Sequence, residues 1–196
     1  MFIESEYFDE TFNNIQFSGQ ELADVSFYDC IFTNCSFGES RFDECKFTGC
    51  TFIRCDLNLC KMTGSKFAQV SFVQSKLVGI NWTEAEWPRI KVPGLLKFEA
   101  CTLNHSTFIG LSLPQCSWVG CSAKDVDFRE AKLPKADLKG TDFSESLFDD
   151  TDLTGADLTN AVNYTIDPSR NPIRQATFTL PEAMNLLYCM DINIVE

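Results

Sequence analysis

The sequence has little histidine, few basic residues and no long apolar run. Its single histidine, His105, leaves little material for histidine-based catalysis or metal binding. The 196 residues hold 28 Asp and Glu against 16 Lys and Arg, a formal charge of −12, so DNA and anionic membranes should repel the chain. There is no apolar run of about 18 residues, as a membrane span needs, and the acidic start does not look like a secretory signal. We expect a cytoplasmic protein with no membrane contact and no direct nucleic-acid binding.

Catalytic and cofactor signatures are also missing. Neither G-x-x-x-x-G-K-[ST] nor G-x-G-x-x-G occurs, so neither of these phosphate-binding loops is predicted. The many Ser and Thr residues have no His or Lys base at a spacing that would support nucleophilic catalysis. We predict that the protein is not an enzyme and holds no cofactor, no metal and no catalytic residue.

What the sequence does contain is phenylalanine, 18 residues in all, at a period of five. From residue 12 to residue 87 every fifth residue is large and apolar, and the series resumes at 98 and runs to 158 with one exception, Ala123. Two places before most of these centres stands a small residue. A period of five fits neither an α-helix nor an ordinary strand. It predicts a solenoid in which the centre and the small residue point inward and the polar or glycine residues between them turn the corners.

These segments resemble a known repeat. Ala136-Asp137-Leu138-Lys139-Gly140 and Ala156-Asp157-Leu158-Thr159-Asn160 are similar to the pentapeptide repeat A(D/N)LXX, and the likeness covers residues 2–162. It implies an all-β fold, a right-handed quadrilateral β-helix with four pentapeptides per coil, in which residue n stacks on residue n+20. The repeats predict about seven coils. We therefore divide the chain into a β-helix, 1–162, interrupted at 88–97, and a capping or dimerisation segment, 163–196.

Ten cysteines invite a metal or disulfide interpretation, but their spacing argues against it. Nine of them fall on the inward small column, five residues or a multiple of five apart within each block, which is the repeat spacing rather than the C-x₂-C of a zinc site. A free cysteine packs as a small apolar side chain. We predict that these nine are core residues.

The interruption at 88–97 contains Pro88, Pro93 and Gly94 and shifts the frame by one residue. Two interpretations remain open: a bulge that re-registers the coil, and a projecting loop that contacts a partner. The candidate contact residues of such a loop are Arg89, Lys91 and Pro93.

After Leu158 the repeat fades and a short helix is expected. Thr179 is a candidate N-cap, followed by Pro181 and Glu182 in the first turn, and Ile192, Ile194 and Val195 alternate like a short strand. This apolar segment can cap the last coil or join two chains, and we expect a homodimer. Its candidate interface residues are Pro181, Met184, Leu187, Tyr188, Met190, Ile192 and Ile194.

Acidic residues gather in two stretches that contain no Lys or Arg. Residues 1–40 hold eight of them and residues 141–169 hold seven. If two chains join by their C-termini, the second stretch flanks the two-fold axis of a rod about 70 Å long, roughly the length of 20 base pairs. Such a rod could compete for a protein groove that holds duplex DNA.

Non-repeat segments indicate a particular branch of the family. Gly79-Ile80-Asn81-Trp82-Thr83, Trp87-Pro88 and the tail segment Leu180-Pro181-Glu182-Ala183 resemble the topoisomerase-protecting pentapeptide proteins, most of all those of albicidin resistance, and also those of microcin B17 immunity and quinolone resistance. The resemblance implies a homodimer that binds DNA gyrase, or topoisomerase IV, and protects it from a poison. The acidic candidates for that contact are Asp142, Glu145, Asp149, Asp150, Asp152 and Asp157. The alternative is an interaction scaffold that does not affect topoisomerases.

Overall fold

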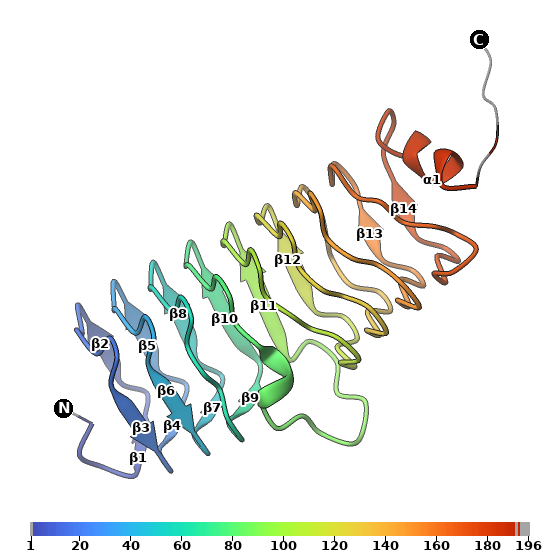
Figure 1. The fold of residues 1–196 in the computed structure, drawn as a ribbon. Helices are drawn as coiled ribbons and strands as arrows, with labels where there is room; N and C mark the ends of the chain where they lie inside the picture. Colours follow the sequence, from blue (N-terminus) through green and yellow to red (C-terminus); the bar gives the residue numbers. More distant parts are fainter. Residues whose placement is uncertain (1, 191, 193–196) are drawn as a thin grey trace.

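The computed structural model describes residues 2–190 and 192. It is a parallel β-solenoid of about nine turns with one short helix near the C-terminus (Figure 1). The predicted fold class is confirmed. The number of turns exceeds the seven expected from the repeats because the coil already includes residues before Phe12 and continues into residues 163–178, where the repeat pattern has faded.

Short strands stack into parallel sheets along the rod. The first sheet contains β1 (Glu6–Phe8), β4 (Ser26–Tyr28), β7 (Lys46–Thr48) and β9 (Lys66–Ala68). The second contains β2 (Thr11–Asn13), β5 (Ile31–Thr33), β8 (Thr51–Ile53), β10 (Val70–Val73), β11 (Leu96–Glu99) and β12 (Ser117–Val119). Two smaller sheets pair β3 (Glu21–Ala23) with β6 (Arg41–Asp43), and β13 (Asp157–Leu158) with β14 (Thr177–Phe178).

Four faces run along the rod, and we number them in chain order by the inward residue at the centre of each. Face 1 is centred on Phe12, face 2 on Phe17, face 3 on Leu22 and face 4 on Phe27. The expected stacking of n on n+20 holds in the strand register, as in Phe12 on Phe32 and Phe27 on Phe47. A residue's face therefore follows from its place among the four pentapeptides of the coil.

Aromatic rings form the core of the rod. Phe52 lies between Phe32 and Phe72, with ring centroids 4.6 and 5.0 Å apart in stacked geometry, and all three side chains are at most 1% exposed. At the open N-terminal end Phe2 makes edge contacts with Phe12 and Phe27. Offset and edge-to-face arrangements of this kind stabilise aromatic pairs beyond the area they bury.

The cysteines of the small column pack as predicted. The nine that lie on it are buried, and the thiols of eight donate to carbonyl groups of the backbone, as Cys45 does to Leu22 O of the preceding coil at 3.3 Å. Burial raises the pKa of Cys45 to about 11 and that of Cys50 to about 12. These two thiols therefore stay protonated and unreactive near neutral pH.

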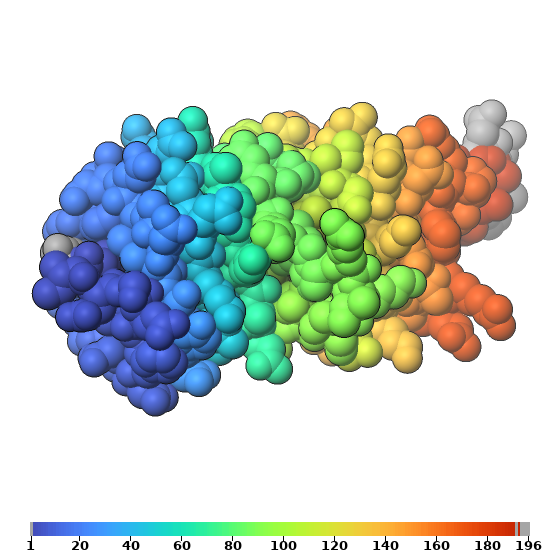
Figure 2. Space-filling view, turned by 90° about the horizontal axis from the view of Figure 1, so that it is seen from below, coloured from blue at the N-terminus to red at the C-terminus, as the bar shows by residue number. Residues whose placement is uncertain are grey.

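The break at 88–97 both re-registers the coil and projects from it. Phe98 pairs with Phe72, whereas in an unbroken coil Val92 would pair with it. The break therefore adds six residues, which is one pentapeptide plus one residue. The extra residues leave the rod as a loop after the 3₁₀ turn η1 (Trp82–Glu84), seen in green in Figures 1 and 2. We call residues 88–94 the loop. The side chain of Ile90 in the loop is 75% exposed.

This loop is expected to be the first site of tryptic cleavage. Arg89 and Lys91 are exposed in irregular backbone, whereas a protease cannot easily fit paired strands into its active site. The two halves should remain associated because β10 pairs with β11 across the cut. Mass spectrometry of a limited digest and gel filtration of the nicked protein check both points. A first cut outside the loop, or separation of the halves, would contradict this account.

The C-terminal helix is shorter than expected and is not capped as predicted. Helix α1 spans Met184–Tyr188, and the residue before it, Ala183, makes no side-chain capping bond. Thr179 Oγ1 instead accepts from Asn160 N at 2.9 Å, and Glu182 Oε1 accepts from Asn163 N at 2.6 Å. These side chains tie the tail to the last coil, and Glu182 Oε1 also accepts from Asn185 Nδ2 of α1 at 3.1 Å. The predicted strand at 192–195 lies, apart from Ile192, outside the described residues.

Candidate protein-binding surfaces

The six acidic candidates do not form one patch. Asp142 and Glu145 lie on face 2 and Asp149 and Asp150 on face 3, as the strand register places them. Two more candidates, Asp152 on face 4 and Asp157 on face 1, lie on the remaining faces. Closeness in sequence therefore brings these residues to one end of the rod, but it distributes them around its circumference.

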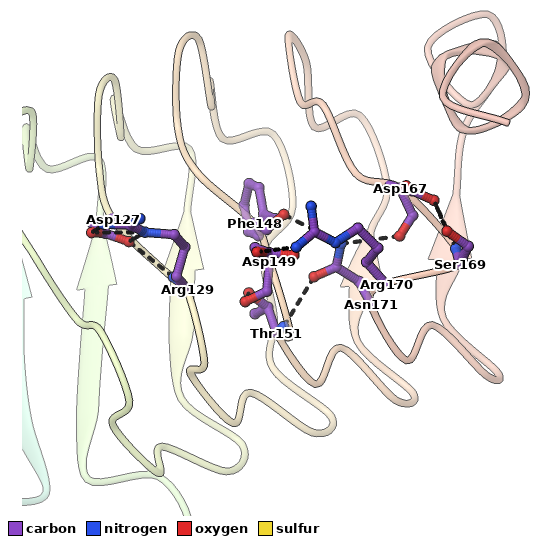
Figure 3. A network of polar contacts seen from close by, with 9 residues as sticks. All are labelled: Asp127, Arg129, Phe148, Asp149, Thr151, Asp167, Ser169, Arg170 and Asn171. Atoms are coloured by element: carbon purple, nitrogen blue, oxygen red, sulfur yellow. Dashed lines mark hydrogen bonds and ion pairs between the residues drawn. The ribbon is translucent and has the colours of Figure 1, made fainter. Parts of the chain in front are cut away.

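Ion pairs neutralise three of the six. Asp149 Oδ2 lies 2.6 Å from Arg170 Nη2, a pair that joins successive coils (Figure 3). Asp142 pairs with Lys124 at 3.0 Å and Asp157 with Lys139 at 3.2 Å. Within the part of the chain that the structure describes, Glu145, Asp150 and Asp152 make no ion pair, so they remain available to bind a cation of another molecule.

Asp142 has the most perturbed carboxylate of this group. Burial raises its pKa, but hydrogen bonds from Ser144, Asn163 and Lys124 outweigh burial and lower the pKa well below the ordinary 3.8. A carboxylate with a lowered folded-state pKa adds stability above its unfolded pKa and loses it as the pH falls toward the folded value. Between pH 4 and pH 2 the parent protein should therefore lose more stability than Asp142→Asn. Urea unfolding at several pH values measures the difference, and equal pH dependence would contradict the assignment.

Face 3 carries the acidic surface that linear sequence analysis missed. Five exposed acids occupy the corner position of this face, each in a different coil. They make no ion pair in the described residues. We call them the acidic ridge. They are Asp24, Glu44, Glu84, Glu130 and Asp150. Three of the bases on this face are paired with other acids: Arg41 with Asp43, Arg129 with Asp127 and Arg170 with Asp149. A fourth base of face 3, Lys61, is exposed and makes no ion pair in the described residues, so the ridge keeps most of its negative charge.

The backbone explains why acids can occupy this column. Most corners turn through a residue with positive φ, and four ridge residues have φ between 53° and 61°, namely Asp24, Glu44, Glu130 and Asp150. Asp adopts this left-handed conformation more readily than most residues, and a corner side chain points away from the core. The ridge does leave a signal in the sequence. Acids recur at the same place in the coil, which is four pentapeptides long.

Several basic side chains lie on face 4 and in the loop. Lys46, Lys66 and Lys132 occupy equivalent positions of different coils there, and Arg89 and Lys91 of the loop are exposed. Acids lie on this face as well, since Glu86 and Asp152 are in register with Lys66 and Lys132, so the charge of face 4 is mixed. Pro93, the third loop candidate, is also exposed.

The C-terminal end exposes apolar side chains. Leu187, Tyr188, Met190 and Ile192 are between 38% and 61% exposed, and Leu180 is 72% exposed. Of the other interface candidates, Pro181 is exposed and Met184 half-buried, while Ile194 lies outside the described residues. An apolar cluster at the end of a solenoid is typical of a surface covered by another molecule.

The described residues offer little chemistry besides binding. They contain no group of three or more His, Cys, Asp or Glu side chains placed to hold a metal ion. His105 lies at an exposed corner with φ 60°, and its Nδ1 is 2.8 Å from Asp125 Oδ2. None of the described helices has the length and apolarity needed to cross a membrane.

Comparison with known proteins identifies the repeats. A family model described as a pentapeptide repeat region matches residues 25–96, and one described as pentapeptide repeats matches 101–140 and 124–160. Two trypsin-treated forms of QnrB1, a plasmid-mediated fluoroquinolone resistance protein, have the same fold, with TM-scores of 0.73 and 0.72 at 17% identity. The superpositions cover 97% of this chain and 99% and 97% of those chains. The search of curated proteins found no match.

Proposed function

Because the chain belongs to the pentapeptide repeat family, we propose that it is a non-enzymatic DNA mimic that binds DNA gyrase, or topoisomerase IV, in the bacterial cytoplasm. Bound there, it protects the enzyme from a poison that traps cleaved DNA and confers antibiotic resistance or self-immunity. Albicidin and quinolones are the candidate drugs. The observation that carries the proposal is the acidic ridge of face 3.

The ridge is a straight and rigid line of negative charges, which favours DNA mimicry. Parallel strands repeat at about 4.8 Å, so the ridge acids recur at about 5–10 Å along a straight line, against 3.4 Å between phosphates of one DNA strand. The paired strands and stacked rings fix the line before binding, which reduces the entropy cost of association. A cationic groove that accepts a duplex can therefore accept this face.

The loop supplies a second contact on a different face. Its exposed Arg89 and Lys91 are cationic, so they would bind an acidic region of the enzyme outside the DNA groove. A positive loop and a negative ridge on one rigid body define an orientation as well as a charge preference.

We infer a homodimer from the exposed apolar end. Tyr188→Asp should convert the dimer to a monomer, because it places a charge in an apolar interface. Light scattering after gel filtration measures the mass, and Phe8→Asp, at an exposed aromatic site at the other end, is the matched control. A parent protein that is already monomeric, or a variant that stays dimeric, would contradict this interface.

A supercoiling assay tests the proposed function. Gyrase is inhibited with albicidin or ciprofloxacin, and the protein is titrated into the reaction. Restored supercoiling identifies a protector and the drug class. If the protein neither restores supercoiling nor inhibits gyrase alone, the interaction-scaffold alternative is favoured instead.

A further inference from the structure

A small apolar cavity lies between face 4 and the loop. Its volume is about 310 Å³, and its lining includes Phe47, Phe67 and Trp87, of which only the Trp87 side chain is partly exposed. Their rings stack in a row, with centroids 5.4 Å apart for Phe47 and Phe67 and 6.2 Å apart for Phe67 and Trp87. Pro88 and Val92 of the loop, with Leu95 after it, complete the lining. The cavity therefore exists only because the loop leaves the rod here.

The lining is held in place from beneath. Phe47 and Phe67 are 2% and 4% exposed and belong to β7 and β9, which pair in register. The Trp87 indole Nε1 donates to Trp82 O at 2.8 Å, which fixes the orientation of the ring. A rigid, preformed apolar cavity binds a ligand without first having to order its own side chains.

One positive charge at the rim lacks a carboxylate partner. Lys66 pairs with Glu86 at 3.2 Å, and both belong to the lining. Lys46, the other lysine of the lining, forms no ion pair within the described residues. Its Nζ lies 4.9 Å from the centroid of the Tyr28 ring and donates to Tyr28 Oη at 3.2 Å. The rim of the cavity is thus left with one unpaired positive charge.

We propose that this cavity binds a small planar aromatic carboxylate. Its volume is at the lower end of the range for ligand sites, about 300–1,000 Å³, so it suits two fused rings rather than a peptide. The ring system would lie against Trp87 and Pro88, and the carboxylate would bind Lys46. The proposal uses face 4 and the loop, so it does not depend on gyrase binding through the acidic ridge.

Calorimetric titration with 2-naphthoate tests the proposal. We expect one molecule to bind per chain, and we expect about tenfold weaker binding for the neutral isostere 2-naphthamide, because the charge-assisted bond to Lys46 is lost. Lys46→Gln should weaken naphthoate binding by a similar factor. Absence of naphthoate binding up to millimolar concentration would overturn the proposal, as would equal binding of the two probes.

Two matched pairs of variants locate the site. Val92→Trp fills the cavity and should abolish binding, whereas Ile90→Trp adds the same side chain to an exposed loop position outside the lining and should leave binding unchanged. Lys132→Gln removes a lysine from the equivalent position of a later coil on face 4 and should also leave binding unchanged. Thermal melts verify that each variant is folded. Binding that survives Val92→Trp in folded protein would place the ligand elsewhere and overturn the proposal.

Discussion

Half-maximal protection of gyrase is expected to require an at least about hundredfold higher concentration of the double variant Glu130→Lys/Asp150→Lys than of the parent protein. Both side chains are exposed corner residues of the acidic ridge and make no ion pair in the described residues. Reversal replaces two attractions to a cationic groove with two repulsions, and close charge pairs at protein interfaces are coupled by about 1.5–7 kcal/mol. The supercoiling assay with poison gives the concentration for half-maximal protection.

The matched control is Asp9→Lys/Asp29→Lys. These acids also lie at corners with positive φ, 53° in both cases, but they lie on face 4. The same change in net charge should leave protection within a few-fold of the parent protein. Lysine is tolerated at such corners, since Lys135 already has φ 57°. Equal losses in the two double variants would show that total charge matters and the ridge does not.

Phe52→Ala is expected to lower the free energy of unfolding by about 4 kcal/mol, within the range for buried Phe→Ala changes. The ring is 1% exposed and stacks on both neighbouring coils. Because each coil contacts only its neighbours, the cavity weakens two interfaces of the solenoid at once. Urea unfolding followed by circular dichroism measures the change.

Ile53→Ala is the control for this variant. The residue adjoins Phe52 in β8 but points outward and is only half-buried, so it should cost far less than Phe52→Ala. A similar loss in the two variants would mean that the stacked rings are not the main source of stability.

The five-residue period predicts the stacking because it is a direct consequence of how the coil buries side chains. Once four pentapeptides make a coil, Phe32, Phe52 and Phe72 must lie above one another, and the register confirms this. The same pattern cannot give the size of the break. A frame shift of one residue is compatible with one, six or eleven added residues, since each added pentapeptide preserves the frame. Packing selects the pairing of Phe72 with Phe98.

The end of the coil is hidden in the sequence for a related reason. Beyond Leu158 the inward positions are filled by residues that break the repeat motif, such as Tyr164 and Ile166, both buried. Asn171 occupies an inward position of the small column. Its side chain accepts from Thr151 N at 2.9 Å and donates to Phe148 O at 3.3 Å (Figure 3). A polar residue there is stable only because these bonds satisfy it, and sequence alone does not show such bonds.

The acidic candidates illustrate how folding redistributes charge. Asp142, Asp149, Asp152 and Asp157 are close in sequence, yet each belongs to a different face. Asp24 and Asp150 are distant in sequence and share one corner. Grouping residues by their place in the coil, rather than by sequence segment, predicts the ridge.

Competition with DNA tests the central claim most directly. Fluorescently labelled protein is bound to gyrase, and anisotropy is followed as unlabelled linear duplex DNA is added. We predict that DNA displaces the protein completely, because the acidic ridge and the duplex occupy the same groove, and that the Glu130→Lys/Asp150→Lys variant binds at least about a hundredfold more weakly. Simultaneous binding of protein and DNA to gyrase, or undiminished binding of that variant, would contradict DNA mimicry by the ridge.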